Sequence, residues 1–466
     1  MPVIVIVADG ARPDSLADAM RRGIVPALAA LRDEGGMHTV TSVFPSVTGP
    51  AYAPFLMGRY PGPIGLPGLR WYDRERKTCR LPGNSRSYVG PEMRHIDKDI
   101  DSSAPTIFEL AKSSVAALNV IGRGLEPQHR IGRGIGFVAR TGKTHFTGKV
   151  QGWLAIDQEI AAEVAGQIRQ KQPDFVFSAM TGIDKTSHSE GHAGAYVDQA
   201  LQIVDAAVAE IRHDAERGGT WESTHLWVVS DHGHSPVLQH EDLAGLVRRL
   251  GFRTIAHPFV FSPRGEIAVM VSGNAMAHVY LDLKLRARPW LHEIDERFTP
   301  VFDVLLARES VDLMILPTGV GSCEIRTASR GHAALTWANG RVSYEPVTGD
   351  PLAIGPQHQI TEDESYDLTL TSDYPDSLVQ IARLSDSPRS GEIILSAARN
   401  WDFRAKYEPI PHESSHGALH REHMLVPLLM NRAPSTRPRR TVDVMPSALD
   451  ALGIMIPPGL DGKSFL

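Results

Sequence analysis

The sequence predicts an α/β fold: a mostly parallel, doubly wound sheet with an inserted α+β cap region. Three observations support this prediction. Apolar runs typical of strands buried on both faces alternate with helical segments through the first half of the chain. Between about residues 235 and 410 the pattern changes to short alternating runs separated by Gly and Pro. After about residue 420 the first pattern returns.

The first half of the chain supplies most strands and helices of the predicted parallel sheet. Val3–Ala8 is a continuous apolar run, which is typical of a strand buried on both faces. Asp14–Glu34 has apolar residues at helical spacing, and Pro26 is expected to divide it into two short helices. Further helices are predicted at Ala104–Lys112, Asp157–Gln170 and Ala195–Ala215, and further strands at Ala116–Ile121, Phe175–Met180 and Leu226–Ser230.

The middle of the chain is predicted to be an insertion. Its short runs include Ala268–Val271, Ala277–Leu281 and Gly391–Ala397. A strand of the parallel sheet is expected again at Met424–Met430, followed by an amphipathic helix at Thr441–Leu452. The predicted core domain therefore comprises residues 1–234 and 411–466, and the predicted cap comprises residues 235–410. Because the cap leaves one strand end and returns near it, we expect it to cover a site there.

Composition and charge exclude some classes of protein. The chain has 466 residues, 42% of them hydrophobic, and a net charge of −6, which argues against a nucleic-acid polymer as partner. The basic residues Arg437, Arg439 and Arg440 are interpreted as an exposed loop. No apolar stretch approaches the ~18 residues of a membrane span. Two cysteines, Cys79 and Cys323, and no signal-peptide pattern predict a cytoplasmic protein, while the oligomeric state stays open.

Acidic side chains follow three of the predicted strands. Asp9 and Asp231 come directly after strands, and Asp184 comes shortly after a third. His232 follows Asp231 directly. His188 lies four residues after Asp184, which places both on one face of a helical turn. Each Asp alone could be a helix cap. Together, at the carboxyl ends of parallel strands, they predict a two-metal hydrolase.

A histidine and a threonine complete the set. His416 lies in a His-Gly pair shortly before the last predicted strand. Thr48 precedes Pro50, where a helix is expected to begin, and Pro54 makes this helix short or kinked. By position alone Thr48 is a helix cap, but beside a metal its hydroxyl could act as a nucleophile. The other histidines near His416 are interpreted as surface residues: His412, His420 and His423.

Taken together, these segments resemble the alkaline phosphatase superfamily, most closely its nucleotide pyrophosphatase/phosphodiesterase branch. The order Asp, Thr, Asp-x3-His, Asp-His-Gly, His-Gly carries the resemblance, and Pro61 and Gly65 match the Pro…Gly stretch of the family. The resemblance extends from the first strand to the C-terminus, except for much of the insertion. It implies hydrolysis of phosphoric esters.

The resemblance also implies the ligands and cofactors, two Zn²⁺ ions. One would be held by Asp184, His188 and His416, and the other by Asp9, Asp231 and His232, with Thr48 beside it. Carboxylate and imidazole suit Zn²⁺ and do not exclude Mn²⁺. Thr48 would be the nucleophile and would form a phosphothreonine, which water then hydrolyses.

One position departs from the family pattern. Where diesterases of this branch carry a phosphate-binding Asn, this chain has Leu69, which cannot donate a hydrogen bond. Arg70 beside it could bind the phosphate instead, or could be a surface arginine stacked on Trp71. Trp71, Tyr72 and Lys185 are further candidates for lining the substrate pocket.

We expect an enzyme of the phosphodiesterase or nucleotide pyrophosphatase type that acts on a small-molecule phosphoester. Two alternatives use the same scaffold: a phosphomonoesterase, or a phosphonate C–P hydrolase, whose Pro-Ser-x-Thr nucleophile region Pro45–Thr48 also resembles. A non-catalytic metal- or phosphate-binding protein is a third alternative, which the complete set of site residues disfavours.

Overall fold

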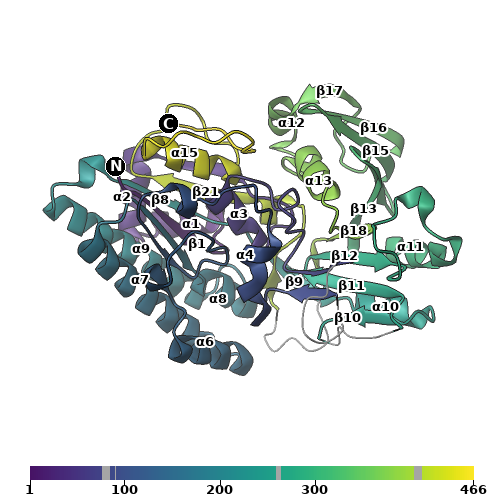
Figure 1. Cartoon of the computed structure of the whole chain (residues 1–466), viewed down its shortest axis with the longest axis horizontal. Helices are drawn as coiled ribbons and strands as arrows, with labels where there is room; N and C mark the ends of the chain where they lie inside the picture. The colour runs from purple at the N-terminus through teal and green to yellow at the C-terminus, as the bar shows by residue number, and fades with distance from the viewer. Residues whose placement is uncertain (76–83, 90, 259–263, 404–411) are drawn as a thin grey trace.

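A computed structural model of the chain describes residues 1–466 apart from 76–83, 90, 259–263 and 404–411. Figure 1 shows a sheet with helices on both faces and a second large sheet built from the middle of the chain. The predicted fold class, a mostly parallel α/β sheet with an additional antiparallel region, is confirmed. Cys79 lies outside the described residues, and Cys323 is buried.

The first sheet has seven strands, and all but one of them run in the same direction. The order is β2 (Met37–Thr41), β21 (Leu425–Met430), β8 (His225–Val229), β1 (Val3–Ala8), β7 (Phe175–Met180), β5 (Ser114–Ala117) and β6 (Arg130–Ile131). From β8 to β6 the pairings are parallel. The carboxyl ends of these strands therefore meet at one edge, where ligands of such sheets bind.

The strand expected at Met424–Met430 is present as β21, but the prediction that it joins the sheet as a parallel strand is wrong. β21 pairs antiparallel with both neighbours. The chain reaches β21 from α14 (Arg421–Met424), whose His423 carbonyl accepts from Gly233 just past the carboxyl end of β8. With no crossover to the opposite edge, the chain can only run back along the sheet.

Both faces of the first sheet are covered, because β1 is apolar at every position. Its residues 3, 5 and 7 pack on one side and residues 4, 6 and 8 on the other. One side is covered by α1 (Pro13–Arg21), α2 (Pro26–Gly35), α7 (Gln151–Lys171) and α9 (Ala195–Arg217). The other is covered by α3 (Ala53–Met57), α5 (Ile107–Leu110) and α15 (Val444–Ala451). Pro26 begins α2, so the predicted break is confirmed.

Two helices differ from the prediction. The segment expected as Ala104–Lys112 forms only α5, which Thr106 and Glu109 cap and which ends where Ala111 becomes extended. The helix α6 (Ile135–Thr147) was not predicted. Its sequence contains Gly136 and Gly142, which lower helix propensity and obscure its periodicity.

The second sheet has nine strands and comes from the predicted insertion. Its order is β10 (Thr254–Ala256), β11 (Ile267–Ser272), β12 (Met276–Leu281), β18 (Ile393–Ala397), β13 (Val311–Gly319), β14 (Ser322–Thr327), β15 (Gly331–Ala338), β16 (Arg341–Gly349) and β17 (Gln357–Thr361). All pairings are antiparallel except β10 with β11. The exact division into a core and a cap stays a prediction.

The chain enters and leaves this region through paired strands. A three-stranded sheet has the order β19 (Asn400–Asp402), β9 (Ser235–His240) and β20 (Ser414–Ser415). β9 follows Asp231 and His232, and β20 leads into His416. Their antiparallel pairing brings these residues together, although they are far apart in sequence.

The remaining elements are short. They are the helices α4 (Ile96–Asp99), α8 (Gly182–Glu190), α10 (Leu243–Arg249), α11 (Thr299–Leu306), α12 (Glu362–Thr369) and α13 (Ser377–Ser385), the 3-10 turns η1 (Pro50–Tyr52), η2 (Pro91–His95), η3 (Pro127–His129), η4 (Trp221–Ser223), η5 (Leu291–Glu293), η6 (Glu296–Phe298) and η7 (Thr441–Asp443), and the strand pair β3 (Arg70–Tyr72) and β4 (Ser85–Ser87). In the described part of the chain, no helix has both the length and the apolar character that crossing a membrane requires.

The interpretation of the basic segment near residue 440 as an exposed loop is wrong for Arg440. This side chain is buried and forms two hydrogen bonds with Asp376, from Nε to Oδ2 (2.8 Å) and from Nη2 to Oδ1 (2.7 Å). A buried guanidinium requires such a partner. Asp376 precedes α13, so this ion pair joins the C-terminal segment to the insertion.

Candidate metal centre

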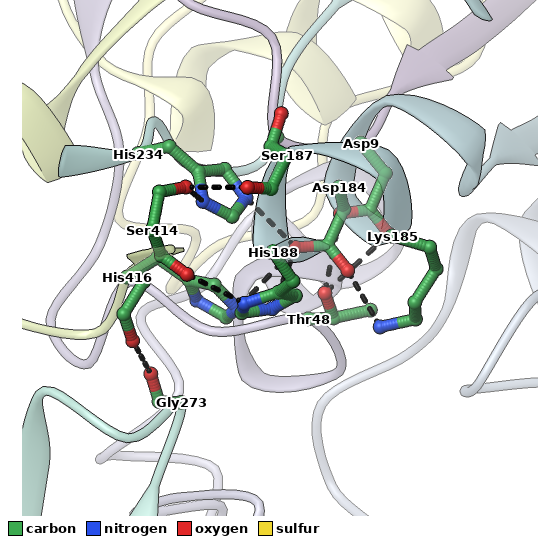
Figure 2. A network of polar contacts seen from close by, with 12 residues as sticks. Asp9, Thr48, Asp184, Lys185, Ser187, His188, His234, Gly273, Ser414 and His416 are labelled. Carbon is green, nitrogen blue, oxygen red and sulfur yellow. Dashed lines mark hydrogen bonds and ion pairs between the residues drawn. The ribbon is translucent and has the colours of Figure 1, made fainter. Parts of the chain in front are cut away.

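The residues predicted as ligands and nucleophile lie together at the carboxyl edge of the seven-stranded sheet, as Figure 2 shows for most of them. Adjacent parallel strands deliver the acidic residues. Asp9 follows β1, Asp231 follows β8, and Asp184 lies on α8, which begins shortly after β7. Thr48 precedes η1 and the five-residue α3, which is as short as Pro54 predicts.

Thr48 lies beside the carboxylate of Asp9 and the imidazole of His232. Its Oγ1 is 3.2 Å from Asp9 Oδ1 and 3.1 Å from His232 Nε2. Asp9 Oδ2 also accepts from the hydroxyl of Tyr52 at 3.0 Å. Asp231 Oδ1 accepts from two backbone N–H groups at 3.2 and 3.1 Å, so its other oxygen is left facing the site. The threonine hydroxyl is therefore held at a strongly negative position.

A second group surrounds Asp184. Its Oδ1 lies 2.9 Å from His234 Nε2, 3.3 Å from His188 Nε2 and 3.4 Å from His416 Nε2. Its Oδ2 pairs with Lys185 Nζ at 2.5 Å. The His416 ring stacks on His232 with centroids 3.7 Å apart, so the two groups adjoin.

The hydrogen bonds of three imidazoles fix which ring nitrogen faces the carboxylates. Their Nδ1 atoms contact backbone carbonyl oxygens, at 2.9 Å for His188 and Ser414, 3.0 Å for His416 and Ser46, and 3.1 Å for His232 and Gly233. A carbonyl oxygen only accepts, so each Nδ1 must donate its proton. Each Nε2 then presents a lone pair to the site, which is the arrangement of an imidazole that binds a metal.

These residues fit a cation, because carboxylate oxygens and imidazole nitrogens face each other across the site. Asp231 Oδ2 is buried, forms no hydrogen bond with the described residues, and lies 3.4 Å from His232 Nε2. Burial, followed by the charges of Asp231 and Asp184, raises the pKa of Asp9 well above its usual value. Burial also raises the pKa of Asp231. A bound cation would offset the cost of burying these carboxylates.

Among the described residues, two sets of side chains bring donor atoms within 4.8 Å of one another: Asp9, Asp231 and His232, and Asp184, His232, His234 and His416. The first is one of the predicted ligand sets. The second contains Asp184 and His416 of the other set together with His232 and His234, but not the predicted ligand His188. The ligand roles themselves stay predictions.

His234 is the site residue that the sequence interpretation missed. It is fully buried and contacts Asp184, yet it lies only two residues after His232. The spacing of His232 and His234 was itself the available signal, because alternate residues of an extended segment point to the same side.

The three histidines interpreted as surface residues are buried, so that interpretation is wrong. His412 stacks on His188 with centroids 4.8 Å apart and contacts Asp402 (Nδ1 to Oδ2, 3.0 Å). His423 accepts from the backbone N–H of Ala418 at 3.0 Å, and His420 packs against His423. Distant segments contact these histidines: Ser235 Oγ lies 2.8 Å from His423 Nε2, and Asn274 Nδ2 lies 2.6 Å from His412 Nδ1. The local sequence alone could not indicate these contacts.

The predicted substrate-binding residues occupy different environments. Lys185 lies beside Asp184, and its ammonium is 5.9 Å from the ring centroid of Trp153. Trp71 is fully buried and packs edge-on against Tyr88. Tyr72 is buried and packs against Tyr280 at 5.8 Å between centroids.

Arg70 is buried on β3, so the alternative of a surface arginine is wrong. The guanidinium over the Trp71 ring is that of Arg389, at 5.9 Å from the centroid. The roles of Arg70, Trp71, Tyr72 and Lys185 in substrate binding stay predictions.

The second sheet reaches the metal centre through the turn between β11 and β12. The backbone N–H of Ala275 donates to the carbonyl of His416 at 3.1 Å, and Ser415 Oγ donates to the carbonyl of Gly273 at 3.1 Å (Figure 2). A Cβ at Gly273 would lie 3.1 Å from His416 Nδ1, so glycine permits this close approach. The insertion therefore helps to hold His416 in place.

This fold, with its Asp and His cluster around a threonine, is that of the alkaline phosphatase superfamily. The chain belongs to the type I phosphodiesterase/nucleotide pyrophosphatase family, whose model matches residues 3–420. The predicted resemblance is thereby confirmed. Membership in this family of metal-dependent enzymes makes the protein a hydrolase of phosphoester bonds. No curated protein matches the sequence.

Solved structures share the fold over nearly the whole chain. Phosphonoacetate hydrolase from Sinorhizobium meliloti 1021, in complex with phosphonoformate, is 17% identical with a TM-score of 0.56, covering 97% of this chain and 96% of that one. Murine ectonucleotide pyrophosphatase/phosphodiesterase 5 is 16% identical with a TM-score of 0.58, covering 98% and 96%. Its human counterpart is 14% identical with a TM-score of 0.59, covering 99% and 97%.

Proposed function

We propose that the protein is a two-metal phosphodiesterase of the nucleotide pyrophosphatase type, with Thr48 as its nucleophile. The observation that carries this proposal is the position of Thr48 Oγ1, within 3.2 Å of both Asp9 and His232. A hydroxyl beside metal-type ligands is suited to activation, whereas a helix cap would accept from the backbone N–H groups of the helix.

Asp9, Asp231 and His232 would hold one ion beside Thr48, and Asp184, His188 and His416 would hold the other. Zn²⁺ suits these ligands, and Mn²⁺ is compatible with them. When bound, the ions would lower the pKa of the attacking hydroxyl and supply positive charge where oxygen charge develops.

The residues of the chain then have separate tasks. Thr48 Oγ1 forms a bond to phosphorus while the bond from phosphorus to the leaving oxygen breaks. Water hydrolyses the resulting phosphothreonine in a second step and restores the hydroxyl. Tyr52, through its 3.0 Å hydrogen bond, holds Asp9 in the orientation that faces Thr48. Lys185, whose Nζ lies 2.5 Å from Asp184 Oδ2, would balance negative charge on the substrate.

The substrate we propose first is a small phosphodiester. Murine ectonucleotide pyrophosphatase/phosphodiesterase 5 has been solved as an inactive threonine-to-alanine variant in complex with AMP. This supports a threonine nucleophile and a nucleotide-like substrate class.

A phosphonate C–P hydrolase is the second candidate. A Cβ at Gly49, next to Thr48, would lie 3.7 Å from Leu69 Cδ1 and 3.9 Å from Val120 Cγ1, so this side of the nucleophile is apolar. The phosphate-binding Asn of related diesterases has no equivalent at Leu69. Phosphonoacetate hydrolase, solved with phosphonoacetate, shares the fold. A phosphomonoesterase remains the third candidate on this scaffold.

Turnover of bis(p-nitrophenyl) phosphate, p-nitrophenyl phosphate and phosphonoacetate by the Zn²⁺-loaded enzyme separates these candidates. We expect kcat/KM to be highest for the diester. Thr48→Ala should lower kcat by at least ~10³, because the nucleophile is lost while binding remains. Thr48→Ser should retain substantial activity. If Thr48→Ala retained more than a tenth of the wild-type kcat, the activation free energy would have risen by less than roughly 1.4 kcal/mol. That result would mean that water attacks phosphorus directly.

A further inference from the structure

Polar ligands contact the hydroxyl of Thr48, but apolar side chains border the next residue, Gly49. A carbon atom placed as a Cβ on Gly49 would lie 3.7 Å from Leu69 Cδ1 and 3.9 Å from Val120 Cγ1, and both distances are ordinary van der Waals contacts. Apart from residues 48–50, no other atom of the described residues would lie within 4 Å of that carbon. Glycine therefore leaves room for one carbon atom beside Thr48, between two methyl groups.

The backbone at Gly49 keeps this room free of a side chain of the protein. Gly49 has φ +99°, a conformation that residues with a Cβ rarely adopt. Its neighbours are accessible to a ligand, because Thr48 and Leu69 are only half-buried. A substrate that reaches Thr48 can therefore place a carbon atom against Leu69 and Val120.

Backbone hydrogen bonds fix the position of Leu69 relative to the metal centre. Its carbonyl accepts from the backbone N–H of Tyr88 at 2.9 Å. The backbone N–H of Arg70, the next residue, donates to Ser272 Oγ at 3.3 Å. Ser272 ends β11, and the turn after it contacts His416. Leu69 is thus held by the same turn that supports a predicted metal ligand.

Val120 comes from a different part of the fold. It follows β5, a parallel strand whose carboxyl end lies at the same edge of the sheet as the metal centre. The segment after β5 is fixed by two hydrogen bonds: Arg133 Nη2 donates to the carbonyl of Asn119 at 2.9 Å, and Asn119 Nδ2 donates to the carbonyl of Ile121 at 2.8 Å. Two separate elements therefore bring methyl groups to the same side of Thr48.

The reaction geometry indicates which part of a substrate these methyl groups meet. In an in-line displacement the leaving oxygen departs on the side opposite the attacking Thr48 Oγ1. A group beside Gly49 adjoins the attacking residue, so it is a substituent that stays on phosphorus. Leu69 also stands where related diesterases carry a phosphate-binding Asn, and it cannot donate a hydrogen bond. The substituent that it meets is therefore better a carbon group than a charged oxygen.

We propose that Leu69 and Val120 are specificity-determining residues that contact an apolar ester group retained on phosphorus. The substrate class is then a phosphodiester whose retained group is uncharged and begins with apolar carbon. This inference rests on the proposed function in taking Thr48 as the nucleophile. A charged group at the same place would lose its hydration without gaining a partner from Leu69 or Val120.

The first test uses p-nitrophenyl methyl, ethyl and butyl phosphate, which share one leaving group and one charge. With the Zn²⁺-loaded enzyme we expect kcat/KM to rise by up to ~4-fold for each of the first added methylenes, because each is buried against the two side chains. Leu69→Asn and Val120→Thr, which change shape little, should each lower the ratio of the butyl to the methyl ester by about fourfold. Val347→Thr changes an exposed valine on β16 and should keep the wild-type ratio.

The second test measures binding and requires no turnover. Isobutylphosphonate and phosphonoacetate have the same number of non-hydrogen atoms, and only the second carries a carboxylate. Calorimetric titration of the Zn²⁺-loaded protein, freed of excess metal, should show isobutylphosphonate binding at least ~10-fold more tightly, with a negative heat-capacity change. Leu69→Asn should reduce this preference.

The two tests separate the inference from the proposed function. If none of the esters is hydrolysed but isobutylphosphonate binds more tightly, the proposed function fails and the apolar contact stands. If the wild-type enzyme hydrolyses the methyl and butyl esters with equal kcat/KM, or if phosphonoacetate binds more tightly than isobutylphosphonate, the inference is overturned, whichever bond the enzyme cleaves.

Discussion

At the scale of the residue, the metal centre brings together acceptor atoms that cannot form hydrogen bonds with one another. The imidazoles of His188, His232 and His416 donate outward to backbone carbonyls and turn lone pairs inward. The carboxylates they meet are buried acceptors. This arrangement is costly for the protein alone and is resolved by cations, which is the physical reason to regard these residues as ligands.

The ligands are predicted to act as two separable sets. His416→Ala or Asp184→Ala should empty one site, and Asp9→Ala or Asp231→Ala the other, because each site loses one of three protein ligands. Elemental analysis of each purified variant should show the metal content falling from about two ions per chain towards one. Four variants that all keep two ions would contradict the assignment.

At the scale of the element, the position of α8 depends on a residue outside the centre. Asp157 on α7 accepts hydrogen bonds from the backbone N–H groups of Thr181 (3.0 Å) and Gly182 (2.7 Å) at the start of α8. A Cβ at Gly182 would lie 2.6 Å from Asp157 Oδ2, so glycine is required for this contact. This carboxylate therefore fixes the helix that carries Asp184 and His188.

Asp157 should make stability depend on pH. Burial raises its pKa to about 7, although both N–H groups lower it. Since the folded pKa exceeds the unfolded value of about 4, the associated stabilisation is complete below pH about 4 and is lost as pH rises through about 7. Asp157→Asn has no such proton to release.

Urea unfolding of metal-free wild type and Asp157→Asn at pH 5.5 and pH 8 measures this effect. The free energy of unfolding of wild type relative to the variant should fall by about 2 kcal/mol between the two pH values. Comparing the difference between the proteins cancels the other titrating groups. An identical difference at both pH values would show that Asp157 does not titrate in this range.

At the scale of the whole molecule, two sheets meet at the metal centre. The first supplies Asp9, Asp184 and Asp231 from its carboxyl edge, and the turn between β11 and β12 contacts His416. Buried carboxylates from several strands mean that metal binding and folding are coupled.

Removal of the metal should therefore affect the whole protein. Dialysis against a chelator should abolish activity and lower Tm, and Zn²⁺ should restore both, since a ligand at 100 times its Kd stabilises the native state by ~2.7 kcal/mol. Adding Mn²⁺ in place of Zn²⁺ in a parallel sample tests whether Mn²⁺ also restores activity and Tm. Full activity in protein shown by elemental analysis to be metal-free would refute the two-metal reading.

Much of the fold and of the metal centre could be predicted from the sequence, because the patterns that indicate them are local. The run Val3–Ala8 is apolar at every position, which only a strand covered on both faces explains, and it forms β1 at those residues. An acidic residue after such a strand lies at the carboxyl edge in any parallel sheet. For this reason Asp9, Asp184 and Asp231 could be grouped before their distances were known.

Other features depend on contacts between distant segments, which no local pattern contains. The direction of β21 follows from where α14 ends. His412 and His423 contact Asn274 and Ser235, which are distant in sequence. His234 has the same residue type as a surface histidine, and only the tertiary structure places it 2.9 Å from Asp184 Oδ1 and 2.9 Å from Ser414 Oγ, 180 residues away in sequence. The sequence by itself determined which side chains reach the edge of the sheet, since periodicity and strand ends are local. The tertiary structure alone decided which of them lie within hydrogen-bond distance of one another, because that distance depends on the final positions of both partners.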